Sequence, residues 1–279
     1  MSLLKMNLNN KVRSSVLLLS LAANAFGAAP QERRVERVRW IMGTLCEIAA
    51  PEAPEAAVNA AFAEIERWDR ILSLYKEESE ASTLNRAAGT GPVPVSADLY
   101  AAVDNALRLA EETGGAFDPT VSRAGWRKVR LDAATRTIDL PAGLGIDFGG
   151  IGKGWALDKA AAALKKSGVT RARFNFGGQI LVIGGGWPVT IPGRALPLIL
   201  RDESVAVSGD SEHPGHIKSP FDGQPVRRPG GAAVVLPSAA AADAWSTALY
   251  VLGKTPPSFR GLSFFDPGIP AVTYKGGRS

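Results

Sequence analysis

The chain has 279 residues, a length that fits one large domain or two closely packed ones. Its 46% hydrophobic and 21% charged residues exclude a disordered chain and a fibre, and its 30 glycines and 19 prolines argue against a helical bundle. The formal net charge is +5, but Lys5, Lys11 and Arg13 lie in an N-terminal segment without acidic residues, and the rest of the chain has 29 basic against 27 acidic residues. Because that remainder is nearly neutral and its charges are interspersed, we expect no nucleic-acid partner.

The first 28 residues are typical of a secretory signal peptide. A basic stretch ends at Arg13, an apolar run covers 16–23, and small residues suited to cleavage follow at Ala23-Asn-Ala25 and Ala25-Phe-Gly27. The apolar run is too short to span a bilayer stably. We therefore expect a cleaved signal over 1–28, no lipid anchor, and export to a bacterial periplasm, with a retained N-terminal anchor as the alternative.

The predicted elements follow one another along the chain. Apolar residues at i, i+3/i+4 spacing predict helices, and short apolar segments between turn residues predict strands. The helices are expected at 54–72, from 96 to a stop at 114–115, at 155–166 and at 239–251. The strands are expected at 40–50, 127–131, 135–140, 171–176, 179–183, 189–191, 196–200, 204–208 and 232–236. A charged stretch at 31–39 and a polar stretch at 73–95 are expected to lack regular structure.

From residue 171 to 236 the predicted strands come without intervening helices, which favours antiparallel pairing over a doubly wound parallel sheet. We therefore expect an α+β fold of mainly antiparallel sheets packed with helices in a single compact unit. The chain has one cysteine, Cys46, and two histidines, His213 and His216, so it has neither an internal disulfide nor a Cys/His zinc cluster. Any metal must be held mainly by oxygen, and Cys46 is interpreted as a buried apolar residue and not as a nucleophile.

The most concentrated glycine motif is Asp147-Phe-Gly-Gly-Ile-Gly-Lys-Gly154, which leads from an apolar strand into the third helix. Such a turn offers backbone N–H groups and a helix N-terminus to an anion, with Lys153 as a point charge. It is not a Walker loop, because Gly154 stands where the serine or threonine would be. A tight strand-to-helix turn with a solvated lysine is the alternative.

Asp243 and Thr247 are four residues apart and share one face of the last predicted helix. Their carboxylate and hydroxyl are hard oxygen ligands of the kind that magnesium or calcium accepts, but the threonine could equally bond back to the helix backbone.

Asp118 could cap a turn or contact a polar ligand. His216, on a turn-rich loop, could be functional or an ordinary surface histidine.

Six segments, taken in order from residue 42 to 253, resemble the ApbE family of FAD:protein FMN transferases. They are Met42-Gly-Thr44; Ser73-Leu-Tyr75 with Ser79-Glu80 and Leu84-Asn85; Gly115-Ala-Phe-Asp-Pro-Thr-Val121; 147–158; Asn175-Phe-Gly-Gly178 with 187–192; and 242–249 with Val251-Leu-Gly253. The resemblance implies a periplasmic, Mg²⁺-dependent enzyme that splits FAD at its pyrophosphate, links FMN to a threonine of an acceptor protein and releases AMP. It implies a transferase domain at 40–253 and a C-terminal extension at 254–279.

The resemblance also implies the site residues. It assigns the metal to the backbone carbonyl of Gly150 and to the side chains of Asp243 and Thr247. Gly209 and His216 would lie beside the reacting phosphates, with His216 as the base for the threonine hydroxyl and Lys153 as a fixed donor to the pyrophosphate. The residues implied to contact FAD are Met42, Tyr75, Asp118, Lys153 and Ile217, with Tyr75 a candidate to stack on adenine.

Two departures from the family pattern concern the rim of the site. Only Ser122-Arg-Ala124 separates Val121 from Gly125-Trp126, where the family has a longer segment, and Ser219 stands where an aspartate is usual. Two other functions therefore remain alternatives: an FAD pyrophosphatase that uses water as the acceptor, and a non-catalytic flavin-binding protein. The acceptor is expected to be a periplasmic or membrane-anchored protein of a redox system.

Overall fold

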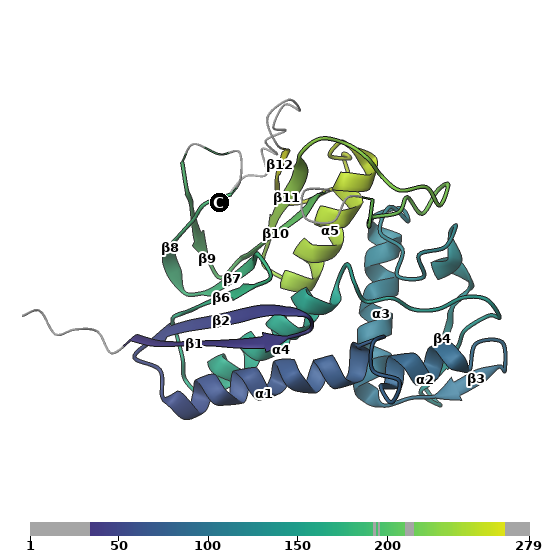
Figure 1. The fold of residues 1–279 in the computed structure, drawn as a ribbon, viewed down its shortest axis with the longest axis horizontal. Helices are drawn as coiled ribbons and strands as arrows, with labels where there is room; N and C mark the ends of the chain where they lie inside the picture. Colours follow the sequence, from purple (N-terminus) through teal and green to yellow (C-terminus); the bar gives the residue numbers. More distant parts are fainter. Residues whose placement is uncertain (1–33, 192–193, 195, 210–214, 266–279) are drawn as a thin grey trace, which may run out of the picture. The chain divides into compact units, whose positions relative to one another are not determined.

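The computed structural model describes residues 34–191, 194, 196–209 and 215–265 (Figure 1). The expected signal peptide at 1–28, His213 and the chain beyond Phe265 lie outside the described residues. The helices are α1 (Glu55–Leu72), α2 (Glu80–Arg86), α3 (Ala97–Glu112), α4 (Gly152–Lys166) and α5 (Ala239–Leu252), with a short 3₁₀ turn η1 (Gly125–Lys128). The strands are β1 (Arg34–Ile41), β2 (Thr44–Pro51), β3 (Pro92–Pro94), β4 (Arg130–Asp132), β5 (Thr137–Asp139), β6 (Ala172–Phe176), β7 (Gln179–Ile183), β8 (Gly185–Val189), β9 (Leu198–Arg201), β10 (Ser204–Gly209), β11 (Gly231–Leu236) and β12 (Leu262–Phe265).

The main sheet has seven strands in the order β1-β2-β6-β7-β10-β11-β12, and every neighbouring pair is antiparallel. A three-stranded sheet, β3-β5-β4, and the hairpin β8-β9 complete the β structure. The described chain forms one compact unit. The predicted α+β class, with mainly antiparallel sheets, is confirmed.

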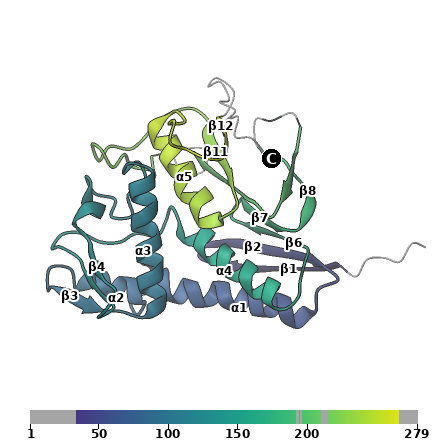
Figure 2. The same cartoon turned by 180° about the vertical axis from the view of Figure 1, so that it is seen from behind.

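The main sheet separates two apolar cores because successive strand residues point to opposite faces. On β10, Ala206 belongs to the larger core while Val205 belongs to the smaller one, and β11 alternates in the same way. The smaller core contains Trp187, Val189 and Leu200 of the β8-β9 hairpin, which therefore covers the face opposite the helices. On the helical face, α4 packs against both α1 and α5 and lies between them (Figures 1 and 2).

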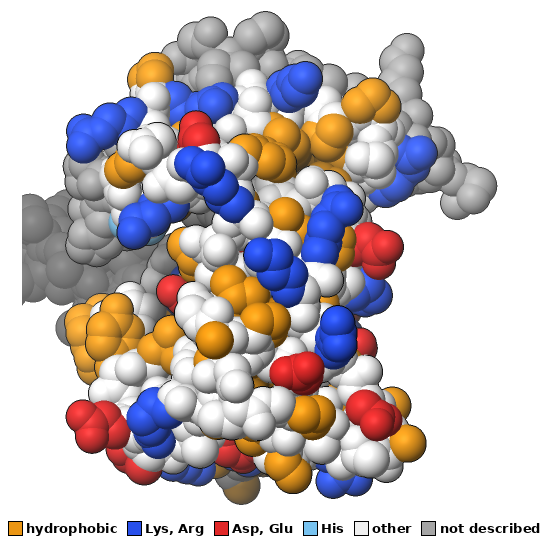
Figure 3. Space-filling view, turned by 90° about the vertical axis from the view of Figure 1, so that its right-hand side faces the viewer, with side chains coloured by type: hydrophobic (Ala, Val, Ile, Leu, Met, Phe, Trp, Pro, Cys, Tyr) orange, Lys and Arg blue, Asp and Glu red, His pale blue; other side chains and the backbone are white. Residues whose placement is uncertain are grey.

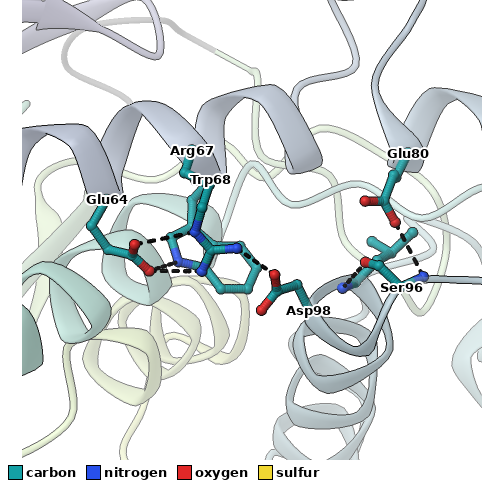
Figure 4. Close-up of polar contacts among 7 residues, drawn as sticks. Glu64, Arg67, Trp68, Glu80, Ser96 and Asp98 are labelled. Carbon is teal, nitrogen blue, oxygen red and sulfur yellow. Dashed lines mark hydrogen bonds and ion pairs between the residues drawn. The ribbon is translucent and has the colours of Figure 1, made fainter.

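Polar contacts fix α2 and α3 relative to α1 (Figure 4). Glu64 accepts hydrogen bonds from the Trp68 indole at 2.9 Å and from the Arg67 guanidinium, which also pairs with Asp98 in the first turn of α3. Ser96 caps α3 by accepting from the Leu99 N–H at 3.1 Å, and its own N–H donates to Glu80 of α2 at 3.3 Å. Apolar residues of α1 and α3 are buried at the predicted helical spacing.

Several expectations about elements were wrong. The strand expected at 40–50 is a hairpin, because Met42 and Gly43 adopt φ values of 49° and 73° and reverse the chain between β1 and β2. The charged stretch before residue 40 forms most of β1, since Arg37 and Arg39 pair with Glu55 and Glu66 of α1.

The stretch at 73–95 contains α2 and β3, and the strand expected at 127–131 is divided between η1 and β4. The main sheet also continues past Gly253, because β12 pairs with β11.

Candidate active site

The glycine motif is a tight turn anchored to the segment after α3. The Asp147 N–H donates to the Pro119 carbonyl at 2.7 Å, and the Asp147 side chain accepts from the Gly149 N–H at 2.7 Å. The helix begins at Gly152, three residues earlier than expected, so that Lys153 lies in the first turn of α4. The Gly152 and Trp155 N–H groups donate to the Phe148 and Ile151 carbonyls, so the motif offers an anion the positive end of the α4 dipole and the Lys153 side chain.

Gly154 allows α4 and α5 to approach closely. A Cβ atom at this position would lie 2.3 Å from the Ala239 carbonyl oxygen, so a larger residue would force the two helices apart. The close approach lets the Gly154 N–H donate to Asp243 Oδ2 at 3.3 Å. The start of α4 and the predicted metal-binding face of α5 thus form one structural unit.

The structure brings the three residues predicted to bind metal to the same place. Asp243 and Thr247 share one face of α5, and a Cβ atom on Gly150 would lie 3.3 Å from Thr247 Oγ1. A Phe117 ring carbon would be equally close to that Cβ, so Phe117 packs against the same spot. The Asp243 carboxylate, the Thr247 hydroxyl and the Gly150 backbone therefore lie in one region of the structure.

Asp243 is buried, and burial raises the pKa of its carboxyl above the ordinary value. The positive charge of Lys153 and the hydrogen bond from Gly154 lower the pKa, but they only partly offset the effect of burial. Asp243 forms no ion pair with any residue that the structure describes. A buried carboxylate of this kind is stabilised in its ionised form by a cation.

The Thr247 hydroxyl does not bond back to its own helix. Its partner is the Ser208 hydroxyl near the end of β10, with 3.2 Å between the two oxygens. The neighbouring Ser246 does bond back, donating to the Asp243 carbonyl at 2.8 Å. Thr247 is therefore aimed toward Gly150 and β10, where the sequence alone left both orientations open.

Asp118 has one satisfied and one unsatisfied carboxylate oxygen. Its Oδ1 caps a turn by accepting from the N–H and the hydroxyl of Thr120, at 2.8 and 2.7 Å. Its Oδ2 is buried and has no hydrogen-bond partner among the described residues. Because unpaired buried carboxylate oxygens are costly, Oδ2 is suited to accept a hydrogen bond from a ligand.

The remaining residues predicted for the site lie outside α4 and α5. Tyr75 is fully exposed after α1, and Met42 is half-buried in the β1-β2 turn. Ile217 is buried, its carbonyl accepting from the Val226 N–H at 2.8 Å. His216 is exposed, and Gly209 ends β10 one residue after Ser208.

The predicted burial of Cys46 is confirmed. Cys46 lies on β2, the strand between β1 and β6, and its side chain is fully buried in the larger core. Burial raises the pKa of the thiol to about 12, with a smaller contribution from the charge of Glu47. The thiolate form that a nucleophile needs is therefore absent at neutral pH.

Asp158 on α4 is a site-supporting residue to which the sequence analysis gave no role. Its two carboxylate oxygens accept from the Ala239 and Ala240 N–H groups at 2.8 and 3.0 Å and from the Ser238 hydroxyl at 2.8 Å. Burial raises its pKa, and these three hydrogen bonds partly lower it. Asp158 thus joins α4 to the N-terminus of α5, the helix that carries Asp243.

We expect Asp158→Ala to destabilise the protein by about 1–3 kcal/mol, because it leaves the first N–H groups of α5 unpaired in a mostly buried position. Asp158→Asn keeps one acceptor and should have a smaller effect. Urea unfolding of both variants measures the loss, with Asp104→Ala, an exposed position on α3, as the matched control. Equal stability of Asp158→Ala and the control would contradict this role.

Two residues with a left-handed backbone conformation lie at the ends of the shortened segment 121–124. Val121 and Ala124 have φ values of 49° and 50°, which non-glycine residues adopt only at an energetic cost. Arg123 then donates to the Asp222 carbonyl at 2.9 Å and so contacts the loop that contains His216. At the position where the family usually has an aspartate, Ser219 stabilises the same loop by accepting from the Phe221 N–H at 3.3 Å.

In the described part of the chain, no group of three or more His, Cys, Asp or Glu side chains is arranged to hold a metal. None of the helices described has the length and apolarity needed to cross a membrane.

Comparison with known proteins identifies the family. The profile of the ApbE family matches residues 42–125 and 121–259, which is well over half of the chain. The protein therefore belongs to the ApbE family, and the resemblance drawn from the six sequence segments is confirmed.

Its relatives are enzymes named FAD:protein FMN transferase. The protein of that name from Treponema pallidum is 29% identical, with 81% of each chain covered. One from Klebsiella pneumoniae is 26% identical and covers 76% of this chain and 77% of its own.

Solved structures show the same fold. An ApbE protein from Thermotoga maritima superposes with a TM-score of 0.71 at 26% identity, covering 79% of this chain and 87% of its own. The flavin transferase ApbE from Vibrio cholerae gives a TM-score of 0.71 with the same coverage, at 24% identity.

Proposed function

We propose that this chain is an FAD:protein FMN transferase that moves FMN from FAD to a threonine hydroxyl of an acceptor protein, depends on Mg²⁺ and releases AMP. The observation that carries the proposal is the convergence of Gly150, Asp243 and Thr247 beside the first turn of α4. This arrangement sets oxygen donors for a cation next to a helix N-terminus with a lysine, and a pyrophosphate needs both. Membership of the ApbE family supports the same reaction.

The donor set fits a magnesium ion. Asp243 contributes a buried carboxylate without an ion-pair partner in the described chain, and the Gly150 carbonyl and Thr247 hydroxyl contribute neutral oxygens. One carboxylate with neutral oxygen donors is typical of magnesium sites that also bind phosphate. When bound there, the ion would neutralise charge on the pyrophosphate as its P–O bond breaks.

The chain's own residues would bind and orient the reactants. Lys153 and the positive N-terminal end of α4 would hold pyrophosphate oxygens, and Asp118 Oδ2 would accept a hydrogen bond from FAD. A threonine hydroxyl is a weak nucleophile until a base accepts its proton, and we assign that role to His216. The threonine oxygen then forms its bond to the FMN phosphorus while the AMP oxygen leaves with the bonding electrons.

Incubation with FAD and Mg²⁺, with and without a threonine-bearing acceptor protein, tests the proposal. We expect covalent flavin on the acceptor together with free AMP. Release of FMN and AMP in equal amounts, with an unlabelled acceptor, would instead identify a pyrophosphatase. Tight FAD binding without either product would identify a flavin-binding protein.

We also propose that the protein acts in the periplasm after its signal peptide is removed. The support is the basic and apolar leader followed by small residues at 23–28. N-terminal sequencing of the exported protein should give a first residue between Phe26 and Gln31. An intact Met1 in a membrane fraction would contradict cleavage.

A further inference from the structure

Positive charge is concentrated in two segments of this otherwise nearly neutral protein. Residues 121–136 and 215–230 together contain eight basic and two acidic residues, a net charge of +6, whereas the whole chain has +5. Adding Asp210 and Glu212 of the intervening loop, which lie outside the described residues, leaves +4. The charge is therefore segregated, although composition alone indicated that it was interspersed.

The two segments lie side by side. Arg123 of the first donates to the Asp222 carbonyl of the second at 2.9 Å, and its charge helps to lower the pKa of the Asp222 carboxyl, which is set mainly by the hydrogen bond from Gln224. Figure 3 shows basic side chains gathered over the upper part of this face, while acidic ones lie mainly in the lower part. We call the surface formed by 121–136 and 215–230 the basic rim.

The exposed cations of the basic rim make few contacts within the fold: Arg123 donates to the Asp222 carbonyl, and Arg127 lies over the Trp126 ring at 4.7 Å. None of its exposed members forms an ion pair with a residue that the structure describes. Like charges gathered in this way repel one another and destabilise the folded state slightly. Their concentration therefore indicates a negatively charged partner. The exposed members are Arg123, Arg127, Lys128, Arg130, Arg136, Lys218 and Arg227.

Two large apolar side chains are exposed within the basic rim. Val121 is 47% exposed, and Phe221 is 56% exposed in the turn that Ser219 stabilises. An exposed aromatic residue surrounded by polar and charged ones is typical of the anchor of a protein–protein interface. A ligand that consists of phosphate groups alone would need the cations but would have no use for the apolar centre.

The basic rim borders the candidate active site. The Val121 N–H donates to the Asp118 carbonyl at 3.0 Å, and Lys218 follows the buried Ile217 and the exposed His216. A partner bound to the rim would therefore present its own groups next to the residues assigned to FAD and to the base. In the proposed reaction the acceptor protein must take such a position, because its threonine has to reach the pyrophosphate of the bound FAD.

We propose that the basic rim is the docking surface for the acceptor protein and that it binds an acidic segment of the acceptor next to the threonine. This inference rests on the proposed function for the identity of the partner. The rim cations attract the acidic segment, and Phe221 supplies an apolar contact at the centre. Because these groups act on the acceptor and not on FAD, their loss should weaken acceptor binding alone.

The test compares two charge-reversed double variants of the full chain. Lys128→Glu with Lys218→Glu removes one exposed cation from each segment of the rim, and neither side chain has been assigned to the catalytic machinery. Lys165→Glu with Lys166→Glu makes the same change in net charge at the far end of α4 and is the control for net charge, although it also breaks the exposed Lys165–Asp202 ion pair. The probes are synthetic threonine peptides flanked by glutamates, by glutamines or by lysines, and vesicles of phosphatidylglycerol.

Peptide binding is measured directly by fluorescence anisotropy, with FAD binding measured in parallel by flavin fluorescence. We expect the wild type to bind the glutamate peptide at least about 10-fold more tightly than the glutamine peptide at low salt, with the preference lost at high salt. The rim variant should lose this preference while binding FAD normally, and the control variant should keep it. Phe221→Ser should instead weaken binding of the glutamate and glutamine peptides alike and leave FAD binding unchanged.

Equal binding of the three peptides, or equal effects of rim and control variants, would overturn the docking surface. Binding of the vesicles without binding of the glutamate peptide would overturn it in favour of a membrane surface. These binding measurements do not require turnover. If the protein prefers the glutamate peptide but transfers no FMN, that result would count against the proposed function alone.

Discussion

Asp243→Ala is expected to reduce Mg²⁺-dependent FMN transfer by about 10³-fold or more, because it removes the one carboxylate assigned to the cation. Asp243→Asn should be nearly as inactive, since it keeps the shape of the side chain and loses its charge. Thr247→Val should have a milder effect, of about 10-fold, because water can replace a neutral hydroxyl ligand. Turnover measured against Mg²⁺ concentration distinguishes the three variants.

Asp243→Asn should make the metal-free protein more stable although it removes the activity. Burial raises the pKa of Asp243 above 3.8, so the folded state holds this proton more tightly than the unfolded chain does. Its contribution to stability is present below pH 3.8 and is lost as the pH rises through the folded-state pKa. Without metal at neutral pH, Asp243→Asn should therefore unfold at a higher temperature than the wild type, and the difference should grow as the pH is raised from about 4.

Magnesium should raise the unfolding temperature of the wild type and leave that of Asp243→Asn unchanged, because only the carboxylate form of the folded protein binds the ion. If Asp243 had only a structural role, accepting the hydrogen bond from the Gly154 N–H, we would expect a different pattern. In that case Asp243→Ala would unfold at a lower temperature but keep full Mg²⁺-dependent transfer per folded molecule, and that result would rule out the metal assignment.

His216→Ala is expected to slow transfer by about 10²- to 10⁴-fold and to leave FAD affinity nearly unchanged, because a general base acts on the threonine hydroxyl and not on the bound flavin. Single-turnover transfer from pre-bound FAD measures the first quantity, and a flavin fluorescence titration measures the second. His213→Ala is the control and should behave as the wild type. Transfer at the wild-type rate by His216→Ala would exclude it as the base.

The four long helices were predictable because their signals are local, whereas the short α2 was missed. Apolar residues of α1 and α3 recur at helical spacing, and Ser96 and Ser238 stand at the N-caps where their side chains accept from the Leu99 and Ala241 N–H groups. The strands β6, β7, β9, β10 and β11 were found close to their positions, but β8 lies at Gly185–Val189 and not at the predicted 189–191. The antiparallel α+β fold followed from their succession without intervening helices.

The parts that could not be predicted depend on contacts distant in sequence. The segment with the arginines of β1 was predicted to lack regular structure because their partners on α1 are 18 and 27 residues away in sequence. Ser208 and Asp158 gave no sequence signal, since Ser208 meets Thr247 across 39 residues and Asp158 meets Ala239 across 81. The clustering of Gly150 with Thr247 likewise requires the α4–α5 contact at Gly154.

Intact-mass measurement of an acceptor protein tests the central proposal most directly. The acceptor is incubated with the wild-type chain, FAD and Mg²⁺, and the experiment is repeated with EDTA, with Asp243→Ala and with an acceptor whose threonine is replaced by valine. The proposal predicts that the acceptor gains the mass of one FMN less one water while one equivalent of AMP is released, and that each of the three changes prevents the gain. An acceptor that stays unmodified while FAD is hydrolysed, or one that gains flavin equally well with Asp243→Ala, would contradict it.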